Sequence, residues 1–319
     1  MGEFELIRQI FEPVARSVTH PDLRLGIGDD CAIQQVGPGR ELVFSVDTLV
    51  EGVHFPANYD PRHLATRALG VAVSDLAAMG ADPVCYTLAL TLPEARRHWL
   101  EAFAESLASA SDDFRIALAG GDTTRGPLTL TLQVHGTVPA GQTLRRSGAA
   151  PGDLIVVSGS LGDAAGALAC LEQPSPTLAQ EHLLARYHRP LPRLALGTAL
   201  RGLATSAIDV SDGLLADVAH LAQASGCRAD LDAASIPLSS SLREVCGEQA
   251  LLHALSGGDD YELCFTLPPR HWQSLQAAVD VPLARVGEMV AGQGVQVHND
   301  GTSIASGIGG YDHFGVPGD

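Results

Sequence analysis

Aspartates beside glycine or serine recur at five places in the sequence, each at or just past the end of an apolar run. The five segments are residues 26–30 (Gly-Ile-Gly-Asp-Asp), 44–48 (Phe-Ser-Val-Asp-Thr), 119–124 (Ala-Gly-Gly-Asp-Thr-Thr), 208–213 (Ile-Asp-Val-Ser-Asp-Gly) and 256–262 (Ser-Gly-Gly-Asp-Asp-Tyr-Glu). Loops at strand ends usually carry the chemistry of a fold. Because Mg²⁺ prefers oxygen ligands and retained waters, the pattern indicates loops that converge on magnesium and a polyphosphate.

Two of these segments contain a Gly-Gly-Asp sequence, at Gly120-Gly121 and at Gly257-Gly258. Paired glycines let backbone N–H groups converge on an anion, as in a phosphate nest. A single Gly-Gly-Asp is more often an ordinary turn. Two of them among five similar loops favour phosphate binding.

Asp75 differs from the other aspartates because it lies inside a helix predicted over residues 60–79. Its helical neighbours include Ala68, Ala72 and Met79, so the carboxylate points along the apolar stripe. An unpaired buried carboxylate is costly. Two explanations stay open: an arginine partner or a buried cap to another loop, and a cation site, which we favour.

Alternating strands and helices must position these residues, and the pattern predicts two α+β domains rather than a doubly wound sheet. A polar stretch rich in Gly, Arg and Pro around residues 139–153 marks the boundary, giving domains at 1–139 and 150–319. Helices are expected at 4–18, 60–79, 93–111, 161–172, 177–188, 192–203, 211–225 and 268–279. Strands are expected at 41–46, 84–92, 116–119, 128–138, 154–157, 207–210 and 261–267, with more in 283–308.

Composition excludes several classes of protein. The 319 residues include 37 acidic and 20 basic ones, all of the latter arginine, for a net charge of −17. Without lysine the chain has no Walker A loop, no protein-kinase active site and no Schiff-base residue for pyridoxal phosphate. A nucleic-acid binder needs a basic face, which this charge argues against.

The sequence also predicts a cytoplasmic protein without a membrane span. Its N-terminus lacks the basic and apolar regions of a signal peptide, and no stretch reaches about 18 apolar residues. The six cysteines are scattered with no Cys-x-x-Cys pair, so reduced thiols are expected rather than a zinc site.

Six long motifs, in order along the chain, resemble the thiamine-monophosphate kinase family, and the resemblance extends to the closing Gly-Tyr-Asp-His-Phe at 310–314. They are residues 28–32 (Gly-Asp-Asp-Cys-Ala), 46–55 (Val-Asp-Thr-Leu-Val-Glu-Gly-Val-His-Phe), 74–81 (Ser-Asp-Leu-Ala-Ala-Met-Gly-Ala), 120–126 (Gly-Gly-Asp-Thr-Thr-Arg-Gly), 209–214 (Asp-Val-Ser-Asp-Gly-Leu) and 256–263 (Ser-Gly-Gly-Asp-Asp-Tyr-Glu-Leu). The wider superfamily includes aminoimidazole ribonucleotide synthetase. The resemblance therefore implies the two-domain α+β fold of this synthetase, with an N-terminal sheet-and-helix domain and a C-terminal α+β domain.

The resemblance implies direct transfer of the ATP γ-phosphoryl group to the phosphate of thiamine monophosphate, with several Mg²⁺ ions. By motif, the magnesium ligands are Asp30, Ser45, Val46 through its backbone, Asp47, Asp75, Asp122, Asp209 and Asp212. Contacts to ATP fall on Gly121, Asp122, Arg146 and Ser211. The thiamine-phosphate site falls on His54, Glu262 and Tyr311, where the family often has Trp.

The chemistry suits these residue types. A phosphate monoester has a second pKa near ~6 and is already ionised at neutral pH, so no general base is expected. The obstacle is repulsion between polyanions, which metal ions and arginine relieve. Glu262 would offset the thiazolium charge and Tyr311 would stack on that ring. Without the motif, Arg145-Arg146 reads as a solvated pair and His54 as structural.

The family also implies a homodimer formed through the N-terminal sheets, with ATP and thiamine monophosphate as the small-molecule partners. Two other functions remain to be tested. A related ATP-dependent synthetase would lack the signatures at 50–55 and 261–262, and a nucleotide sensor would have lost metal ligands; neither departure is present.

Overall fold

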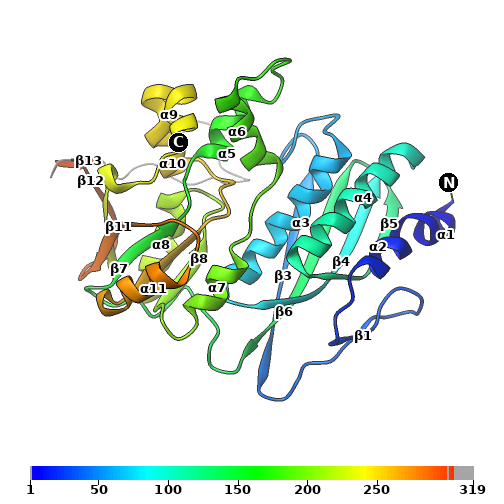
Figure 1. Ribbon diagram of the computed structural model, residues 1–319, viewed down its shortest axis with the longest axis horizontal. Coiled ribbons are helices and arrows are strands. Elements are labelled where there is room, and N and C mark those ends of the chain that lie inside the picture. The colour runs from blue at the N-terminus through cyan, green and yellow to red at the C-terminus, as the bar shows by residue number, and fades with distance from the viewer. Residues whose placement is uncertain (1, 300–301, 305–319) are drawn as a thin grey trace. The chain divides into compact units, whose positions relative to one another are not determined.

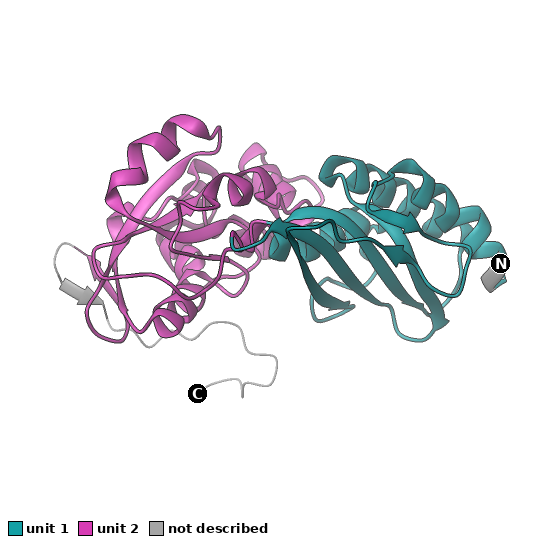
Figure 2. Ribbon diagram, turned by 90° about the horizontal axis from the view of Figure 1, so that it is seen from below, with its two compact units in different colours: residues 1–76, 81–141 teal, residues 77–80, 142–319 magenta. Residues whose placement is uncertain are grey.

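The computed structural model describes residues 2–299 and 302–304, which divide into two compact units (Figures 1 and 2). Unit 1 comprises Met1–Leu76 and Ala81–Gly141, and unit 2 comprises Ala77–Gly80 and Gln142–Asp319. Each unit combines a sheet with helices, which confirms the predicted α+β class. No helix in the described part of the chain is long and apolar enough to span a membrane.

Unit 1 is a four-stranded sheet in the order β3-β6-β4-β5, with helices against one face (Figure 2). Its strands are β3 (Arg40–Val50), β4 (Asp82–Leu92), β5 (Ala117–Arg125) and β6 (Thr129–Pro139), and its long helices are α3 (Pro61–Ala78) and α4 (Arg97–Phe114). Shorter elements are α1 (Glu3–Leu6), a π-helical turn (Ile7–Phe11), α2 (Glu12–Ser17), β1 (Leu23–Leu25) and β2 (Ile33–Gln34).

The two faces of the unit 1 sheet differ because side chains alternate along each strand. Leu132 of β6 and Leu88 of β4 lie beneath the helices, with exposed fractions of 0% and 4%. On the other face, Phe44 and Val46 of β3 are 62% and 60% exposed. One face is therefore the core of unit 1. The other exposes an apolar stripe along β3, beside His135 of β6, which Gln34 of β2 reaches at 2.7 Å.

Unit 2 is a seven-stranded sheet in the order β13-β12-β9-β11-β7-β10-β8. Its strands are β7 (Leu154–Ser158), β8 (Ser206–Asp209), β9 (Arg228–Asp232), β10 (Leu263–Leu267), β11 (Leu283–Val290), β12 (Gly294–Asn299) and β13 (Thr302–Ile304). Its helices are α5 (Asp163–Ala167), α6 (Leu178–His188), α7 (Leu194–Leu200), α8 (Leu214–Ser225), α9 (Ser240–Cys246), α10 (Ala250–Ser256) and α11 (Trp272–Ala278).

Alternate residues of the central strands of unit 2 enter two different cores. Ile155 and Val157 of β7 pack with side chains of α8 and α10. Val156, between them, packs with side chains of α7 and α11. A strand with buried residues on both sides is a continuous apolar run in the sequence. This run, rather than an alternating pattern, predicted β7.

Two strands are longer than the sequence predicts, and this changes where the aspartates lie. The predicted strand ends at Val46, but β3 continues to Val50, so Asp47 lies inside the strand. The predicted strand ends at Ala119, but β5 continues to Arg125, so Asp122 also lies inside a strand. Both are edge strands of the sheet, where polar side chains and glycines are tolerated.

Candidate functional site

Ser45 and Asp75 meet on the helix-covered side of the unit 1 sheet. The Ser45 hydroxyl donates a short hydrogen bond to Oδ2 of Asp75, which lies on α3 and is half-buried. Asp47 lies two residues beyond Ser45, on the same face of β3. These oxygens come together because α3 presents its apolar stripe, with Ala72 and Leu76 fully buried, to that face.

The described partner of Asp75 bears on the two explanations left open by its sequence. Among the residues that the structure describes, its carboxylate is hydrogen-bonded to a hydroxyl, and no arginine is paired with it. A carboxylate on a buried helix face without a cationic partner suits a cation ligand. Its assignment to magnesium therefore stays a prediction, and the arginine alternative is not seen.

A cavity of about 1040 Å³ runs along β5 of unit 1 and contains a second group of predicted residues. Asp30, Gly121 and Asp122 line it, together with the apolar side chains of Ile7 and Phe11. Its size is at the upper end of the range for small-molecule sites. The cavity therefore combines an apolar part with a carboxylate- and glycine-rich part, as a nucleotide requires.

Gly121 is required by the packing of two strands. A Cβ atom at this position would lie 1.9 Å from the carbonyl oxygen of Leu88 on β4. At Gly120 a Cβ atom would meet nothing within 4 Å. Both glycines line the cavity, and the nest proposed for their N–H groups stays a prediction.

The predicted magnesium ligands of unit 1 do not form one cluster. A single cross-strand row runs from Asp47 through Leu132 and Leu88 to Gly121. Three strand spacings of about 4.8 Å separate its ends, about 14 Å along the sheet. Asp122, one residue further, points to the opposite face from Asp47. Within the described ranges, no three His, Cys, Asp or Glu side chains are placed to hold one metal ion.

His54 follows β3 and has a defined tautomer. Its Nδ1 accepts a hydrogen bond of 3.0 Å from the backbone N–H of Val50. A neutral imidazole with an accepting Nδ1 carries its proton on Nε2. His54 is therefore set up as a hydrogen-bond donor through Nε2, which suits an anionic ligand.

In unit 2, the turn that carries Ser211 and Asp212 is held by Asp217 of α8. Oδ2 of Asp217 accepts hydrogen bonds from the N–H groups of Ser211 (3.0 Å) and Asp212 (3.1 Å). Burial, and then the nearby carboxylates of Asp209 and Asp212, raise the pKa of Asp217 to about 8. The helix predicted over residues 211–225 begins after Gly213 instead, with no side-chain cap.

The loop that follows α10 packs directly on this turn. A Cβ atom at Gly258 would lie 2.2 Å from the carbonyl oxygen of Ser211. The N–H of Asp259 donates to that same carbonyl at 2.9 Å, and the N–H of Tyr261 donates to Val210 at 2.9 Å. The phosphate nest predicted at Gly257-Gly258 is not formed by the Gly257 N–H, because this group donates to the carbonyl of His253 at 2.8 Å.

Glu262 has partners that the sequence did not indicate. Its carboxylate is fully buried and accepts hydrogen bonds from Ser158 Oγ (2.6 Å), Arg186 (2.7 Å) and Arg193 Nε (2.6 Å). The expectation that Glu262 offsets a thiazolium charge by direct contact is therefore corrected, since two guanidinium groups already neutralise it. Its role at the substrate site stays a prediction.

The remaining predicted residues are Arg146 and Tyr311. Arg146 lies exposed in unit 2, in the segment where Arg145 accepts a backbone hydrogen bond from Ala207 of β8. Tyr311 lies outside the described residues, so its assignment is untested. Asp217, Arg186 and Arg193 were missed by sequence reasoning. Only Asp217 gave a signal, a carboxylate on the apolar face of a predicted helix.

Both units match families of known proteins. Residues 28–138 match the AIR synthase related protein, N-terminal domain, and residues 150–300 match the AIR synthase related protein, C-terminal domain. The thiamine-monophosphate kinase of Salmonella typhimurium is 48% identical to this chain over 324 residues, which cover 99% of each chain. These matches confirm the predicted fold.

Two solved structures are similar over nearly the whole chain. Thiamine-monophosphate kinase from Stenotrophomonas maltophilia K279a is 47% identical, with a TM-score of 0.86, covering 95% of this chain and 98% of that one. A structure described as AaThiL complexed with AMPPCP and TMP is 31% identical, with a TM-score of 0.80, covering 98% and 97%.

Proposed function

The chain belongs to the thiamine-monophosphate kinase family, and on this premise we propose how its residues transfer the γ-phosphoryl group of ATP to thiamine monophosphate. The enzyme class is that of the family, an ATP-dependent phosphotransferase. The observation that carries the proposal is the Asp75–Ser45 pair, an oxygen-donor set on a buried helix face whose carboxylate pairs with no arginine in the described part of the chain. The other roles are assigned around this pair.

Magnesium fits the residues present, by the chemistry of the donor set. Ser45, Asp47 and Asp75 supply hydroxyl and carboxylate oxygens, the ligands that Mg²⁺ prefers over nitrogen and sulfur. Asp30, Asp122, Asp209 and Asp212, with the Val46 carbonyl, complete the proposed set. When bound, the ions supply charge neutralisation between the two reacting phosphates.

Residues of the chain then bind and orient the two substrates. We assign Gly121, Asp122, Arg146 and the hydroxyl of Ser211 to ATP, since the N–H of Ser211 is already donated to Asp217. His54 donates from Nε2 to the substrate phosphate, and Tyr311 stacks on the thiazolium ring. The acceptor phosphate is already ionised, so orientation and charge neutralisation suffice without a general base.

We further propose a homodimer formed through the open face of the unit 1 sheet. Leu42, Phe44 and Val46 expose 42%, 62% and 60% of their surface there, in a stripe along β3. Within one copy, Asp47 and Asp122 lie on opposite edge strands of the sheet, so one copy alone holds them apart, and the second copy is proposed to supply one of the two carboxylates to a shared site. This pairing supports an active site that needs both copies.

A cytoplasmic location is part of the proposal. All six cysteines are free thiols, as expected for a reducing compartment.

The function is tested by incubating the protein with Mg-ATP and thiamine monophosphate. Thiamine diphosphate is then measured by fluorescence after oxidation. Formation of the diphosphate with stoichiometric ADP is expected. Absence of product contradicts the proposal, turnover of ATP with a purine-pathway amide instead supports a synthetase, and binding without turnover supports a sensor.

A further inference from the structure

We propose that Arg186 and Arg193, held on the buried carboxylate of Glu262, form a binding subsite for a phosphoryl group of one of the substrates. This subsite rests on the proposed function and adds two arginines to it. No motif of the sequence indicated them.

The two guanidinium groups converge on one carboxylate. Arg193 donates from Nε to Oε2 of Glu262 at 2.6 Å and from its terminal nitrogen to Oε1. Arg186, from α6, donates to the same Oε1 at 2.7 Å. Arg193 alone satisfies both oxygens, so Arg186 adds a second positive charge where the first already suffices.

The carboxylates of the two nearest acids, Asp260 and Asp163, bond to groups other than these arginines. Asp260 is 2% exposed and accepts the N–H of Gly162 at 2.8 Å, and burial raises its pKa well above the usual range. Asp163 is hydrogen-bonded to Ser160 (2.6 Å) and Ser239 (2.5 Å).

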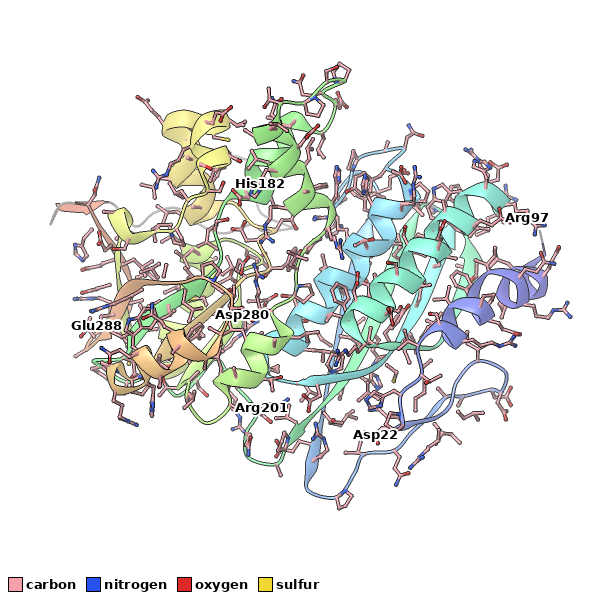
Figure 3. The ribbon with its side chains drawn as sticks, viewed as in Figure 1. Asp22, Arg97, His182, Arg201, Asp280 and Glu288 are labelled. Atoms are coloured by element: carbon pink, nitrogen blue, oxygen red, sulfur yellow. The ribbon has the colours of Figure 1, made fainter. Side chains whose placement is uncertain are left out.

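Asp163 also lies 3.6 Å from Nε2 of His182, the α6 histidine labelled in Figure 3. The two arginines therefore share one described ion-pair partner, the carboxylate of Glu262. Two guanidinium groups on one carboxylate offer more N–H donors than its oxygens accept, so an anion can be bound by the remainder.

The arginines remain reachable from solvent. Their side chains are 13% and 22% exposed, whereas the carboxylate between them is fully buried. A guanidinium group presents five N–H donors in a planar fork that matches phosphate oxygens. Glu262 and, for Arg186, the Asp260 carbonyl at 3.3 Å occupy only part of each fork, and the remaining N–H groups suit a phosphate.

Position links this subsite to the proposed metal and nucleotide residues of unit 2. Leu263, the residue after Glu262, pairs with Asp209 in the β10–β8 ladder. The N–H of Val210 donates to the carbonyl of Glu262 at 2.8 Å, and Ser211 follows directly. The arginine pair is thus anchored one residue from the Asp209–Asp212 turn.

Glu262 is accordingly a positioning residue that acts through the two arginines. Gly159, with a φ of +61°, supports this arrangement, because a Cβ atom there would lie 2.3 Å from Oε1 of Glu262. A substrate would meet positive charge here, so the subsite takes its phosphate rather than its thiazolium ring.

The test uses calorimetric titration of the full chain with thiamine monophosphate, with thiamine, and with the Mg²⁺ complex of a non-hydrolysable ATP analogue. Arg186→Gln and Arg193→Gln are compared with the wild type. Arg243→Gln is the matched control, since it removes one charge from an exposed position on α9 of the same unit. Thermal unfolding monitors the fold of each variant.

We expect each glutamine variant to bind a phosphate-bearing ligand about 10- to 100-fold more weakly, with thiamine binding and the Arg243→Gln control unchanged. If only the affinity for thiamine monophosphate falls, the subsite binds the phosphate of that substrate. If only the affinity for the ATP analogue falls, the subsite binds a phosphate of ATP. Arg193→Lys, which keeps the charge but not the fork, should lose less than Arg193→Gln.

Unchanged binding of both phosphate ligands in folded variants overturns the subsite, as does an equal loss for thiamine and its phosphate. If the glutamine variants fail to fold, the same comparison is made with Arg186→Lys and Arg193→Lys. Failure of the subsite can be told apart from failure of the proposed function, because in the second case the wild type itself would form no thiamine diphosphate.

Discussion

Asp47 and Gly121 lie at opposite ends of one cross-strand row in the unit 1 sheet, joined through Leu132 and Leu88. The row places about 14 Å between the two edge strands that carry the predicted metal and nucleotide residues. The motifs at 46–55 and 120–126 are thus far apart in the sheet of one chain. Either a second copy brings them together or they serve different ions.

Replacing Asp75 with Asn should abolish turnover and leave the fold intact. The amide keeps the shape and the hydrogen bond with Ser45 but loses the charge that a cation needs. We expect kcat/KM of Asp75→Asn to fall by at least about 100-fold. Ser45→Ala should lower kcat/KM by about 10- to 100-fold, because it removes the hydroxyl that orients the Asp75 carboxylate. The measurement is steady-state kinetics with a circular dichroism melt.

Asp112→Asn is the control for this experiment, because Asp112 is an exposed aspartate on α4 of the same unit. It should keep wild-type kinetics. Wild-type activity in Asp75→Asn would remove Asp75 from the metal ligands.

Gly121→Ala should destabilise the protein, whereas Gly120→Ala should not. The first substitution drives a methyl group into the Leu88 carbonyl, and the second places it in open space. Overpacking of this kind costs about 1–3 kcal/mol. Urea denaturation of the two variants gives the comparison. Equal stability of the two would mean that β5 does not pair with β4 in this register.

The sequence was sufficient for the fold class and for most elements, because amphipathic patterns such as that of α3 are local. It failed where tertiary contacts decide. The polar residues of β3 and β5 read as loops, yet pairing with β6 and β4 extends both strands past Asp47 and Asp122. Likewise, nothing local to Ile7–Phe11 announces the π-helical turn in the first helix.

Site prediction had the same limit. Asp30, Ser45 and Asp75 could be proposed from the sequence because each lies in a contiguous motif. Arg186 and Arg193 were missed because only folding brings them to Glu262, about 70 residues away in sequence. The glycines of the 256–262 loop were given a ligand role because sequence does not distinguish a nest from a close packing contact.

Asp217 should make the metal-free protein less stable as pH rises. Its pKa is about 8 in the folded protein against 3.8 in a model peptide, so the unfolded chain ionises first. Stability is then lost between about pH 4 and 8, by up to about 1.4 kcal/mol per pH unit, and levels off above. Asp217→Asn keeps an acceptor oxygen for the Ser211 and Asp212 N–H groups and lacks the titration.

Thermal unfolding in a chelator, at several pH values, tests this difference. The variant should melt above the wild type at pH 8 and converge with it near pH 4. Parallel melting curves for the two proteins across the range would contradict the shifted ionisation.

Phe44→Glu should convert a dimer to a monomer. A charge in the centre of the open apolar stripe cannot be buried without a partner. Light scattering should give about twice 33.2 kDa for the wild type and 33.2 kDa for the variant. Leu178→Glu, at an 85% exposed position on α6 of unit 2, is the control and should stay dimeric. A wild type that is monomeric at micromolar concentration would contradict the interface.

Complementation between two inactive variants tests the shared active site most directly. Asp47→Asn and Asp122→Asn chains are co-expressed with different tags, and the mixed dimer is purified through both. If each site takes Asp47 from one copy and Asp122 from the other, one of the two sites in the mixed dimer is intact. We expect the mixed dimer to have about half of the wild-type kcat per dimer, and both homodimeric variants to be inactive. A mixed dimer as inactive as its parents would contradict it.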